Sequence, residues 1–199
     1  MTGTYDLSRT AVQLVDPYND FLSEGGKLWP LVKPVAAEVR LLDNLRTTIT
    51  AARNADVPVF FVPHRRWEET NYEGWDHPNP NQLGVNQQAI FARSSWGGQF
   101  HPDFQPHPGE VVVTEHWAHS GSANTDLDVQ LKQGGITHVV LVGVVANTCV
   151  ESTGRFAMEL GYHVTLVRDT TAAFSAEMMH ACTLSSIDVY SAWMGGCLQ

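Results

Sequence analysis

Five short runs of apolar, largely β-branched residues recur along the chain, and segments with a helical pattern separate them. The runs are TAVQLV (10–15), VPVFFV (57–62), EVVVT (110–114), THVVLVGV (137–144) and HVTLVR (163–168). Runs this apolar are typical of strands that are buried on both faces. The helical patterns cover residues 35–55, 125–135, 149–161 and 175–189. The alternation predicts right-handed crossovers and an α/β fold of three layers, a parallel sheet with helices on both faces.

The length and charge of the chain narrow its organisation and its partners. A chain of 199 residues can form one sizeable α/β domain and is too short for two with separate cores, so we expect one domain over 1–199. The chain has 12 basic and 21 acidic residues, which gives a net charge of −9, and Lys and Arg form no dense run. These features argue against nucleic acid or a membrane as partner and favour a small molecule.

Several sequence features bear on the compartment. No apolar run reaches the roughly 18 residues that span a bilayer, and the N-terminus lacks the pattern of a signal peptide. The three cysteines include no CxxC pair, which fits reduced thiols better than a disulfide framework or a zinc site. We therefore expect a cytoplasmic protein without a cofactor, in which Cys182 and Cys197 are not catalytic.

The segment 63–109 is the long exception to the strand and helix pattern. It is rich in Pro, Gly, Asn and Trp, and a loop of this length in a compact domain is usually functional. We expect it to cover a pocket and to hold one short helix near 82–92. Aromatic side chains can either anchor such a loop or line the pocket beneath it, and the candidates for lining are Phe21, Trp67, Trp75 and Trp117.

Cys149 lies where the fourth apolar run passes into a helical segment. The strand is expected to end near Val144 and the helix to begin at about Cys149. Unpaired N–H groups and the helix dipole at that position would lower the thiol pKa from about 8.5 and could hold an oxyanion. A lone cysteine can also be an inert core residue. The carboxyl end of a central strand, however, is where chemistry collects in such sheets, so Cys149 is the candidate nucleophile.

Asp16 ends the first apolar run and is followed by Pro17. An acid at the end of a buried parallel strand shares a sheet edge with Cys149 and could accept the thiol proton. Its structural alternative is to cap the turn that follows. Asp169, after the fifth run, is expected to cap a turn.

Three stretches together carry a family resemblance. QLVDPYNDFLSEGG (13–26), SGSANTDLDVQLKQGGI (120–136) and GVVANTCVESTGRFAMELGYHVTLVRDTTAAF (143–174) resemble the isochorismatase-like cysteine hydrolases, which include nicotinamidases, N-carbamoylsarcosine amidase and ureidoacrylate hydrolase. The resemblance implies a Rossmann-like fold with a six-stranded parallel sheet, assembly as homo-dimers or tetramers, and a triad of Asp, Lys and Cys. It assigns Asp16 as the acid, Cys149 as the nucleophile and Val145–Ala146 as a cis peptide bond that helps to form the oxyanion hole.

The lysine of that triad has no counterpart here, because the segment EVVVTEHW contains none. Thr114, which closes the apolar run, is the expected occupant of the lysine position, and His116 is the alternative. Loss of the ammonium would leave Cys149 less ionised. His116 and His119 could then act as substitute bases. Ser122 replaces a phenylalanine that lines the pocket in the family, and Ser122 and His119 are expected to contact the substrate.

Metal binding is the other interpretation of the histidines. Some relatives of the nicotinamidases hold a divalent ion with an aspartate and two histidines between the second and third strands. This region contains His64, His77, His101 and His107, and none of them forms the D-x-H arrangement. The last three precede proline in apparent turns. We expect no metal.

Three functional hypotheses follow. The first is hydrolysis of a C–N bond in a small amide, lactam or carbamoyl compound, with Cys149 attacking the carbonyl, Asp16 moving the proton, and N–H groups near Ala146 and Cys149 holding the oxyanion. The second is Asp16-driven chemistry without a thioester, such as enol ether hydrolysis, isomerisation or cyclisation. The third is a catalytically impaired or engineered variant that acts as a binder.

Overall fold

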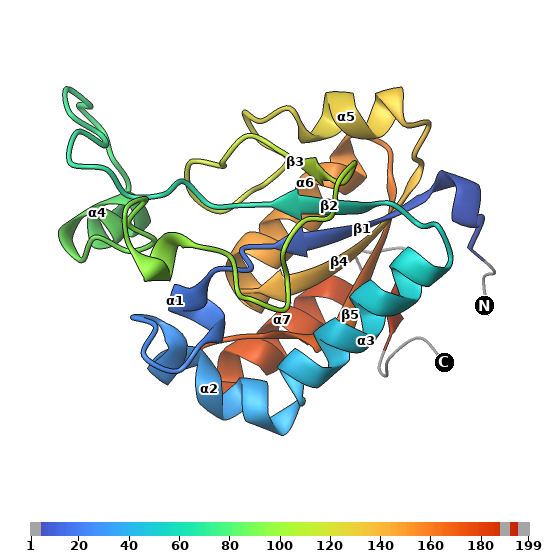
Figure 1. Cartoon of the computed structure of the whole chain (residues 1–199), viewed down its shortest axis with the longest axis horizontal. Coiled ribbons are helices and arrows are strands. Elements are labelled where there is room, and N and C mark those ends of the chain that lie inside the picture. Colours follow the sequence, from blue (N-terminus) through green and yellow to red (C-terminus); the bar gives the residue numbers. More distant parts are fainter. Residues whose placement is uncertain (1–4, 188–191, 195–199) are drawn as a thin grey trace.

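The sheet of the computed structural model has six parallel strands in the order β3-β2-β1-β4-β5-β6 (Figure 1). The structure describes residues 5–187 and 192–194. The strands are β1 (Thr10–Val15), β2 (Val59–Val62), β3 (Val111–Val112), β4 (His138–Val144), β5 (His163–Ala172) and β6 (Ala192–Met194). The five predicted strands are confirmed. The parallel α/β class is confirmed as well, and β6 brings the sheet to six.

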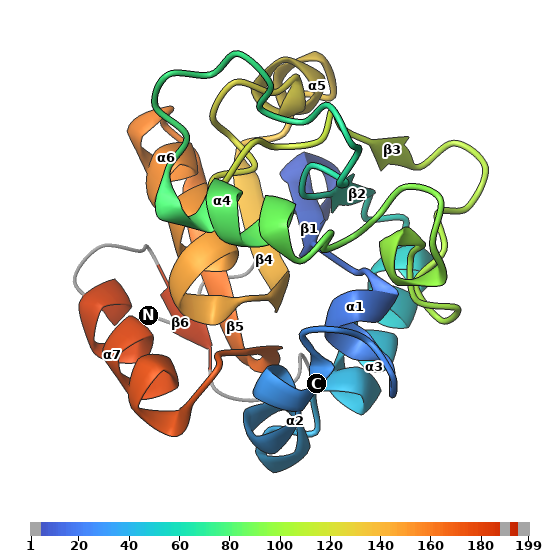
Figure 2. The same ribbon diagram turned by 90° about the vertical axis from the view of Figure 1, so that its left-hand side faces the viewer.

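Helices cover both faces of the sheet, as the alternation predicted (Figures 1 and 2). Val12 and Leu14 of β1 belong to a core shared with α2 (Trp29–Glu38), α3 (Leu41–Asn54) and α7 (Ala176–Ile187). Ala11 and Val15, which alternate with them, belong to the core shared with α5 (Leu127–Gln133) and α6 (Glu151–Glu159). Among the described residues, no helix is long and apolar enough to cross a membrane.

Two predicted elements differ from the structure. The segment 35–55 belongs to two helices, because Arg40 between α2 and α3 has a left-handed backbone (φ 54°) that no α-helix continues through. Asp169 caps no turn but lies inside β5, which continues past the predicted end to pair its Thr171 with Gly143 of β4. The last residues predicted for the helix 175–189, and Cys197, lie outside the described residues.

The segment 63–109 contains α4 (Pro80–Gln87), which lies across the carboxyl end of the sheet (Figure 2). Asn79 and Gln82 form a capping box at its start. The helix ends earlier than predicted, since Ala89 and Phe91 have left-handed backbones (φ 48° and 54°). The remaining short elements are α1 (Asn19–Leu22), the 3-10 turns Leu7–Arg9 and Trp96–Gly98, and the π-helical turn Ala146–Val150.

A buried carboxylate attaches this segment to the rest of the molecule. Asp20 of α1 is 2% exposed. Its Oδ2 accepts a hydrogen bond of 2.7 Å from the backbone N–H of Phe91, and its Oδ1 accepts one of 3.0 Å from the N–H of Lys27. Gly97 packs so closely that an added Cβ would lie 2.4 Å from the carboxylate. The loop that follows α4 is therefore fixed on the loop that follows β1.

Replacement of Asp20 should destabilise the fold more than its surface counterpart does. Asp20→Ala removes both charged acceptors and leaves the buried N–H of Phe91 and the partly buried N–H of Lys27 unpaired, so we expect a loss of about 2–4 kcal/mol in the free energy of unfolding. Urea unfolding followed by tryptophan fluorescence measures this loss. Asp76→Ala, at an exposed position, is the control and should stay within about 0.5 kcal/mol of the parent. Equal stability of the two variants would contradict the role of Asp20.

Candidate functional site

Asp16, His116 and Cys149 come together at the carboxyl edge of the sheet. One ligand-type atom from each lies within 4.8 Å of the other two, and the residues are 0%, 0% and 5% exposed. Nε2 of His116 lies 3.0 Å from Oδ1 of Asp16. Asp16 follows β1 and Cys149 follows β4, and these two strands are neighbours in the sheet. The predicted meeting of acid and thiol is thus present in the structure.

The backbone of Asp16 has a conformation that is uncommon for a residue with a side chain. Its φ is 52°, its N–H donates to the carbonyl oxygen of Val62, and its carbonyl accepts from the N–H of Tyr18. Left-handed conformations at residues other than glycine cost energy and concentrate at functional sites. This turn directs the chain away from the sheet directly after β1.

His116, and not Thr114, is the residue that faces Asp16. Strand β3 ends at Val112, so the alternation of a continuous strand no longer places Thr114 and His116 on one face. Thr114 is exposed and donates its N–H to Oδ1 of Asp126. His116 forms an isolated parallel bridge with His64, beyond the end of β2. Thr114, the expected occupant of the lysine position, therefore does not contact Asp16, whereas His116, the alternative, does.

Glu115 helps to hold the segment that carries His116. Its carboxylate accepts hydrogen bonds of 2.6 Å from Nε of Arg66 and 3.0 Å from Nη2 of Arg93. Arg65 lies over the ring of Trp117, with its guanidinium carbon 4.9 Å from the ring centroid. These arginines could otherwise bind a carboxylate of a ligand. In the structure they instead contact a carboxylate and an aromatic ring of the protein itself.

Cys149 lies in the turn that precedes a helix and not at the first residue of that helix. The π-helical turn Ala146–Val150 leads into α6, which begins at Glu151. The cis peptide bond joins Val144 to Val145, one bond before the predicted Val145–Ala146, because β4 ends at Val144 and the change of chain direction begins there. The carbonyl oxygen of Ala146 accepts a hydrogen bond from Sγ of Cys182 (3.4 Å).

The pKa of Cys149 moves in the direction opposite to the one expected from a helix N-terminus. Burial of the thiol raises its pKa well above the usual value, and the neighbouring carboxylate of Asp16 raises it further. Hydrogen bonds with the side chain of Thr148 and with the backbone of Val145 lower the pKa, but by less than burial and Asp16 raise it. Cys149 is therefore a neutral thiol at pH 7, and a base has to accept its proton during any attack.

His64 adds a second imidazole beside His116. The ring centroids are 5.0 Å apart and the rings meet edge to face. Burial lowers the pKa of His64 to about 4, so the ring is neutral near pH 7. Its Nδ1 lies 2.8 Å from the carbonyl oxygen of Arg65, which can only accept, so Nδ1 carries the proton and Nε2 is an acceptor. Among the described groups, Nε2 of His64 and Nδ1 of His116 have no hydrogen-bonding partner.

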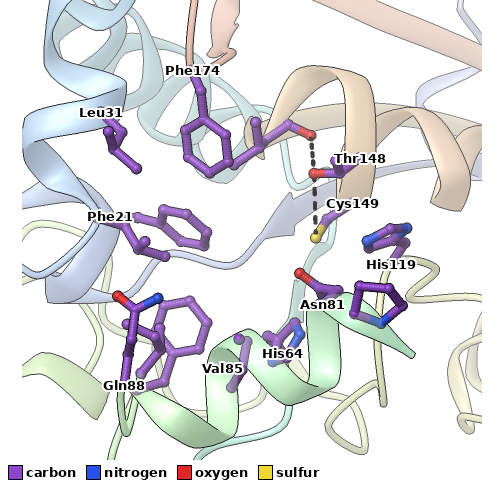
Figure 3. Close-up of a pocket in the computed structure, with 16 residues that line it drawn as sticks. Phe21, Leu31, His64, Asn81, Val85, Gln88, His119, Thr148, Cys149 and Phe174 are labelled. Atoms are coloured by element: carbon purple, nitrogen blue, oxygen red, sulfur yellow. Dashed lines mark hydrogen bonds between the residues drawn. The ribbon is translucent and has the colours of Figure 1, made fainter. Parts of the chain in front are cut away.

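A small cavity of about 230 Å³ opens at Cys149 (Figure 3). Its walls are mainly apolar and come from four parts of the chain: Phe21, Leu28, Leu31, Val85, Ile90, Phe91, Val145 and Phe174. A few polar side chains interrupt them, namely His64, Asn81, Gln88, His119 and Thr148. Binding sites for drug-sized ligands typically measure about 300–1,000 Å³, so this cavity is suited to a smaller molecule.

The predicted pocket residues divide into three groups. Phe21 lines the cavity at Cys149, and His119 lines both this cavity and a neighbouring hollow of about 430 Å³. Trp75 and Trp117 line only the second hollow. Trp67 and Ser122 line neither. The indole N–H of Trp67 donates to Asn86, and Ser122 is buried with its hydroxyl donating to the carbonyl of Thr153, so hydrogen bonds direct both elsewhere.

Most of the apolar side chains that line the cavity at Cys149 were not predicted from the sequence. Val85 and the short run AIFA (89–92), which contains Ile90 and Phe91, are apolar within a polar segment, and that contrast was a usable signal of a buried side. His64 was considered only as a metal ligand. Phe174 follows β5 and carried no signal beyond its position after a strand.

These features define a class, an α/β protein in which a buried aspartate, histidine and cysteine adjoin a small-molecule cavity. Residues 10–195 match the model of the isochorismatase domain family. The chain belongs to the isochorismatase family, and it is a hydrolase of that family.

Solved structures of related proteins agree with this assignment. A cysteine hydrolase from Pseudomonas syringae pv. phaseolicola is 26% identical, with a TM-score of 0.79 over 98% of this chain and 94% of that one. N-carbamoylsarcosine amidase from Thermoplasma acidophilum is 25% identical, with a TM-score of 0.72 over 96% and 98%. An isochorismatase-like hydrolase from Alkaliphilus metalliredigens is 26% identical, with a TM-score of 0.72 over 94% and 93%.

Removal of the Asp16 charge should make Cys149 more reactive toward a simple alkylating agent. The carboxylate raises the thiol pKa, so Asp16→Asn should lower that pKa and move the pH midpoint of iodoacetamide alkylation downward. The thiolate fraction at a fixed lower pH rises about tenfold for each unit by which the pKa falls. Peptide mass spectrometry measures the rate, and the Cys182 peptide of the same digest reports any general opening of the core. An unchanged or higher midpoint would contradict the assigned cause.

Proposed function

We propose that this protein hydrolyses a C–N bond in a small amide, lactam or carbamoyl compound through a thioester on Cys149. The observation that carries the proposal is a buried group of a thiol, a carboxylate and an imidazole, of which the thiol borders an apolar cavity. Similarity to an N-carbamoylsarcosine amidase and to a cysteine hydrolase supports C–N chemistry with a sulfur nucleophile.

Asp16 is the base in this proposal. Its Oδ1 is held by His116, while its Oδ2 has no hydrogen-bonding partner among the described protein groups. Oδ2 accepts the proton of Cys149 as the sulfur attacks the carbonyl carbon of the substrate. The protonated acid then donates that proton to the leaving nitrogen, and the C–N bond breaks. A water molecule, losing its proton to Asp16, hydrolyses the thioester, and the thiol is restored.

The turn that carries Cys149 would hold the negative charge on the substrate oxygen. Backbone N–H groups of the turn Ala146–Val150 belong to the same few residues as the sulfur, and fixed N–H dipoles in a site closed to water stabilise an oxyanion strongly. We assign Val145 and Ala146 to this oxyanion hole because they stand at the start of the turn. The apolar walls imply a substrate with a compact apolar part beside its amide group.

His116 takes the place of the missing lysine. It orients Asp16 through the 3.0 Å contact, and protonated it would supply the positive charge that lysine supplies elsewhere in the family. His119 lies beside Cys149 in Figure 3 and borders the cavity, so it is placed to contact substrate.

A second candidate function has one observation in its favour. The raised pKa of Cys149 disfavours a thiolate and leaves Asp16 free to act in acid–base chemistry without a thioester, as in enol ether hydrolysis, isomerisation or cyclisation. Both schemes use Asp16, and only the first forms a bond to sulfur.

Cys149 variants and adduct mass separate the schemes. Under the proposal, Cys149→Ala lowers kcat/KM on a responsive small amide by at least about 1,000-fold, because the nucleophile is gone. Enzyme quenched during turnover shows the acyl mass on the peptide that contains Cys149. Cys182→Ser keeps a donor for Ala146 and should retain activity. A fully active Cys149→Ala enzyme would exclude the thioester, and binding without turnover of any screened amide would favour a binder.

Two substitutions on one segment test which residue replaces the lysine. His116→Ala should lower kcat/KM about 100-fold or more, since Asp16 loses its positioning contact. Thr114→Lys places an ammonium on the exposed face and should change kcat/KM by no more than about twofold. Steady-state kinetics on one substrate compares them. A large gain for Thr114→Lys, or an unaffected His116→Ala, would reverse the assignment.

A further inference from the structure

We propose that Asp16, His116 and Cys149 bind one Zn²⁺ ion and that this ion reversibly blocks the thiol. Carboxylate oxygen, imidazole nitrogen and thiolate sulfur are each established zinc ligands, and three protein ligands with one open position form the usual plan of an accessible zinc site. The mixture of sulfur, nitrogen and oxygen disfavours Mg²⁺ and Ca²⁺, which select oxygen.

The spacing of the donor atoms suits a metal of this size. Zinc bonds of about 2.0–2.3 Å in a tetrahedral arrangement place neighbouring ligand atoms about 3.3–3.8 Å apart. The donors of Asp16, His116 and Cys149 already lie within 4.8 Å of one another. Side-chain movements of about 1 Å therefore close the site, without any change in the strands that carry it.

The charges of the site favour a cation. Asp16 is fully buried, and within the described residues its ion-pair partner is His116, with no lysine or arginine paired to it. A buried carboxylate without a full positive partner is costly. A Zn²⁺ ion bound to the carboxylate, the thiolate and a neutral imidazole makes a group of zero net charge. The ion thus supplies the positive charge that the absent ammonium would otherwise provide.

His64 provides the support that a zinc-bound histidine needs. Coordination through Nε2 of His116 leaves its proton on Nδ1, which is a buried atom without a partner. The neighbouring ring of His64 presents Nε2 as an acceptor that is also buried and unpartnered. Histidines on metals usually donate their second N–H to such an acceptor, and this contact fixes the ring. With zinc bound, the two unpartnered atoms would become partners of each other through a small rotation of the adjacent rings, whose centroids are 5.0 Å apart.

The consequence for the thiol follows from the chemistry of binding. Zinc displaces the S–H proton of Cys149 to solvent and forms a Zn–S bond, with no change in oxidation state. The sulfur lone pair is then engaged, and the carboxylate that would accept the thiol proton is occupied as well. Cys149 and His119 both border the cavity, so His119 or a water molecule would be available as the fourth ligand. Only this inhibitory effect rests on the proposed function; the binding itself does not.

Zinc titration of the chelator-treated full-length protein tests the binding directly. Competition with a chromophoric chelator should give one ion per chain with a Kd below about 1 μM. Asp16→Asn, His116→Ala and Cys149→Ser should each weaken binding by about 100-fold, and His64→Phe by about tenfold. His101→Ala and Cys182→Ser, outside the site, are the controls and should bind as the parent does.

Cobalt supplies a readout that does not depend on the variants folding. Co²⁺ added to the parent protein should produce the near-ultraviolet charge-transfer band of a sulfur–cobalt bond, and Cys149→Ser should lack it. Absence of this band in the parent, or zinc binding that survives all three ligand substitutions, would overturn the site.

Activity measurements separate the zinc proposal from the proposed amide hydrolysis. Stoichiometric zinc should abolish hydrolysis, and a chelator should restore it. Zinc binding in a protein that hydrolyses no amide would refute the hydrolase proposal alone, whereas full activity with zinc bound would refute the block.

Discussion

The parallel pairing of β1 with β4 is the constraint on which the site depends. These strands are adjacent in the sheet although more than a hundred residues separate them in the sequence, and their register places Val15 opposite Gly143. Gly143 has a left-handed backbone (φ 111°), and an added Cβ would lie 2.2 Å from the carbonyl oxygen of Val15. The two strands can therefore approach at their carboxyl ends only with glycine at this position. Asp16 and the Cys149 turn leave the sheet immediately beyond this contact.

Burial sets the electrostatics of the site once the strands are paired. An aspartate, a histidine and a cysteine share a space from which water is largely excluded, and the described residues place no ammonium beside them. In such surroundings the neutral thiol is favoured, and the carboxylate depends on the imidazole of His116. The same shortage of positive charge explains why one arrangement supports two proposals, proton transfer to Asp16 and capture of a cation.

Sequence patterns predicted those parts of the fold and the site that depend on position along a strand. Asp16 and Cys149 were identified because each follows a buried apolar run, and the carboxyl ends of parallel strands meet at one edge. That His116 rather than Thr114 contacts Asp16 could not be predicted, because the run EVVVT gives no sign that β3 stops at Val112. A two-residue strand is decided by what packs around it.

Properties that depend on packing were beyond the sequence. Burial by residues distant in the chain raises the pKa of Cys149, whereas a helix N-terminus at this position would have lowered it. Trp67 and Ser122 were expected at the pocket because aromatic and family positions suggested it. Their hydrogen bonds to Asn86 and Thr153 could not be inferred from spacing.

The attachment of Phe91 to Asp20 couples two parts of the enzyme that have different tasks. Phe91 belongs to the cover of the cavity, and Asp20 lies four residues after Asp16 on the loop that leaves β1. A ligand that contacts Phe91 therefore also affects the short segment between Asp16 and Asp20, to which the backbone of Phe91 is hydrogen-bonded. Under the proposed function, filling of the cavity and alignment of Asp16 rise together, so that a poorly fitting molecule loses both affinity and correct placement of the base.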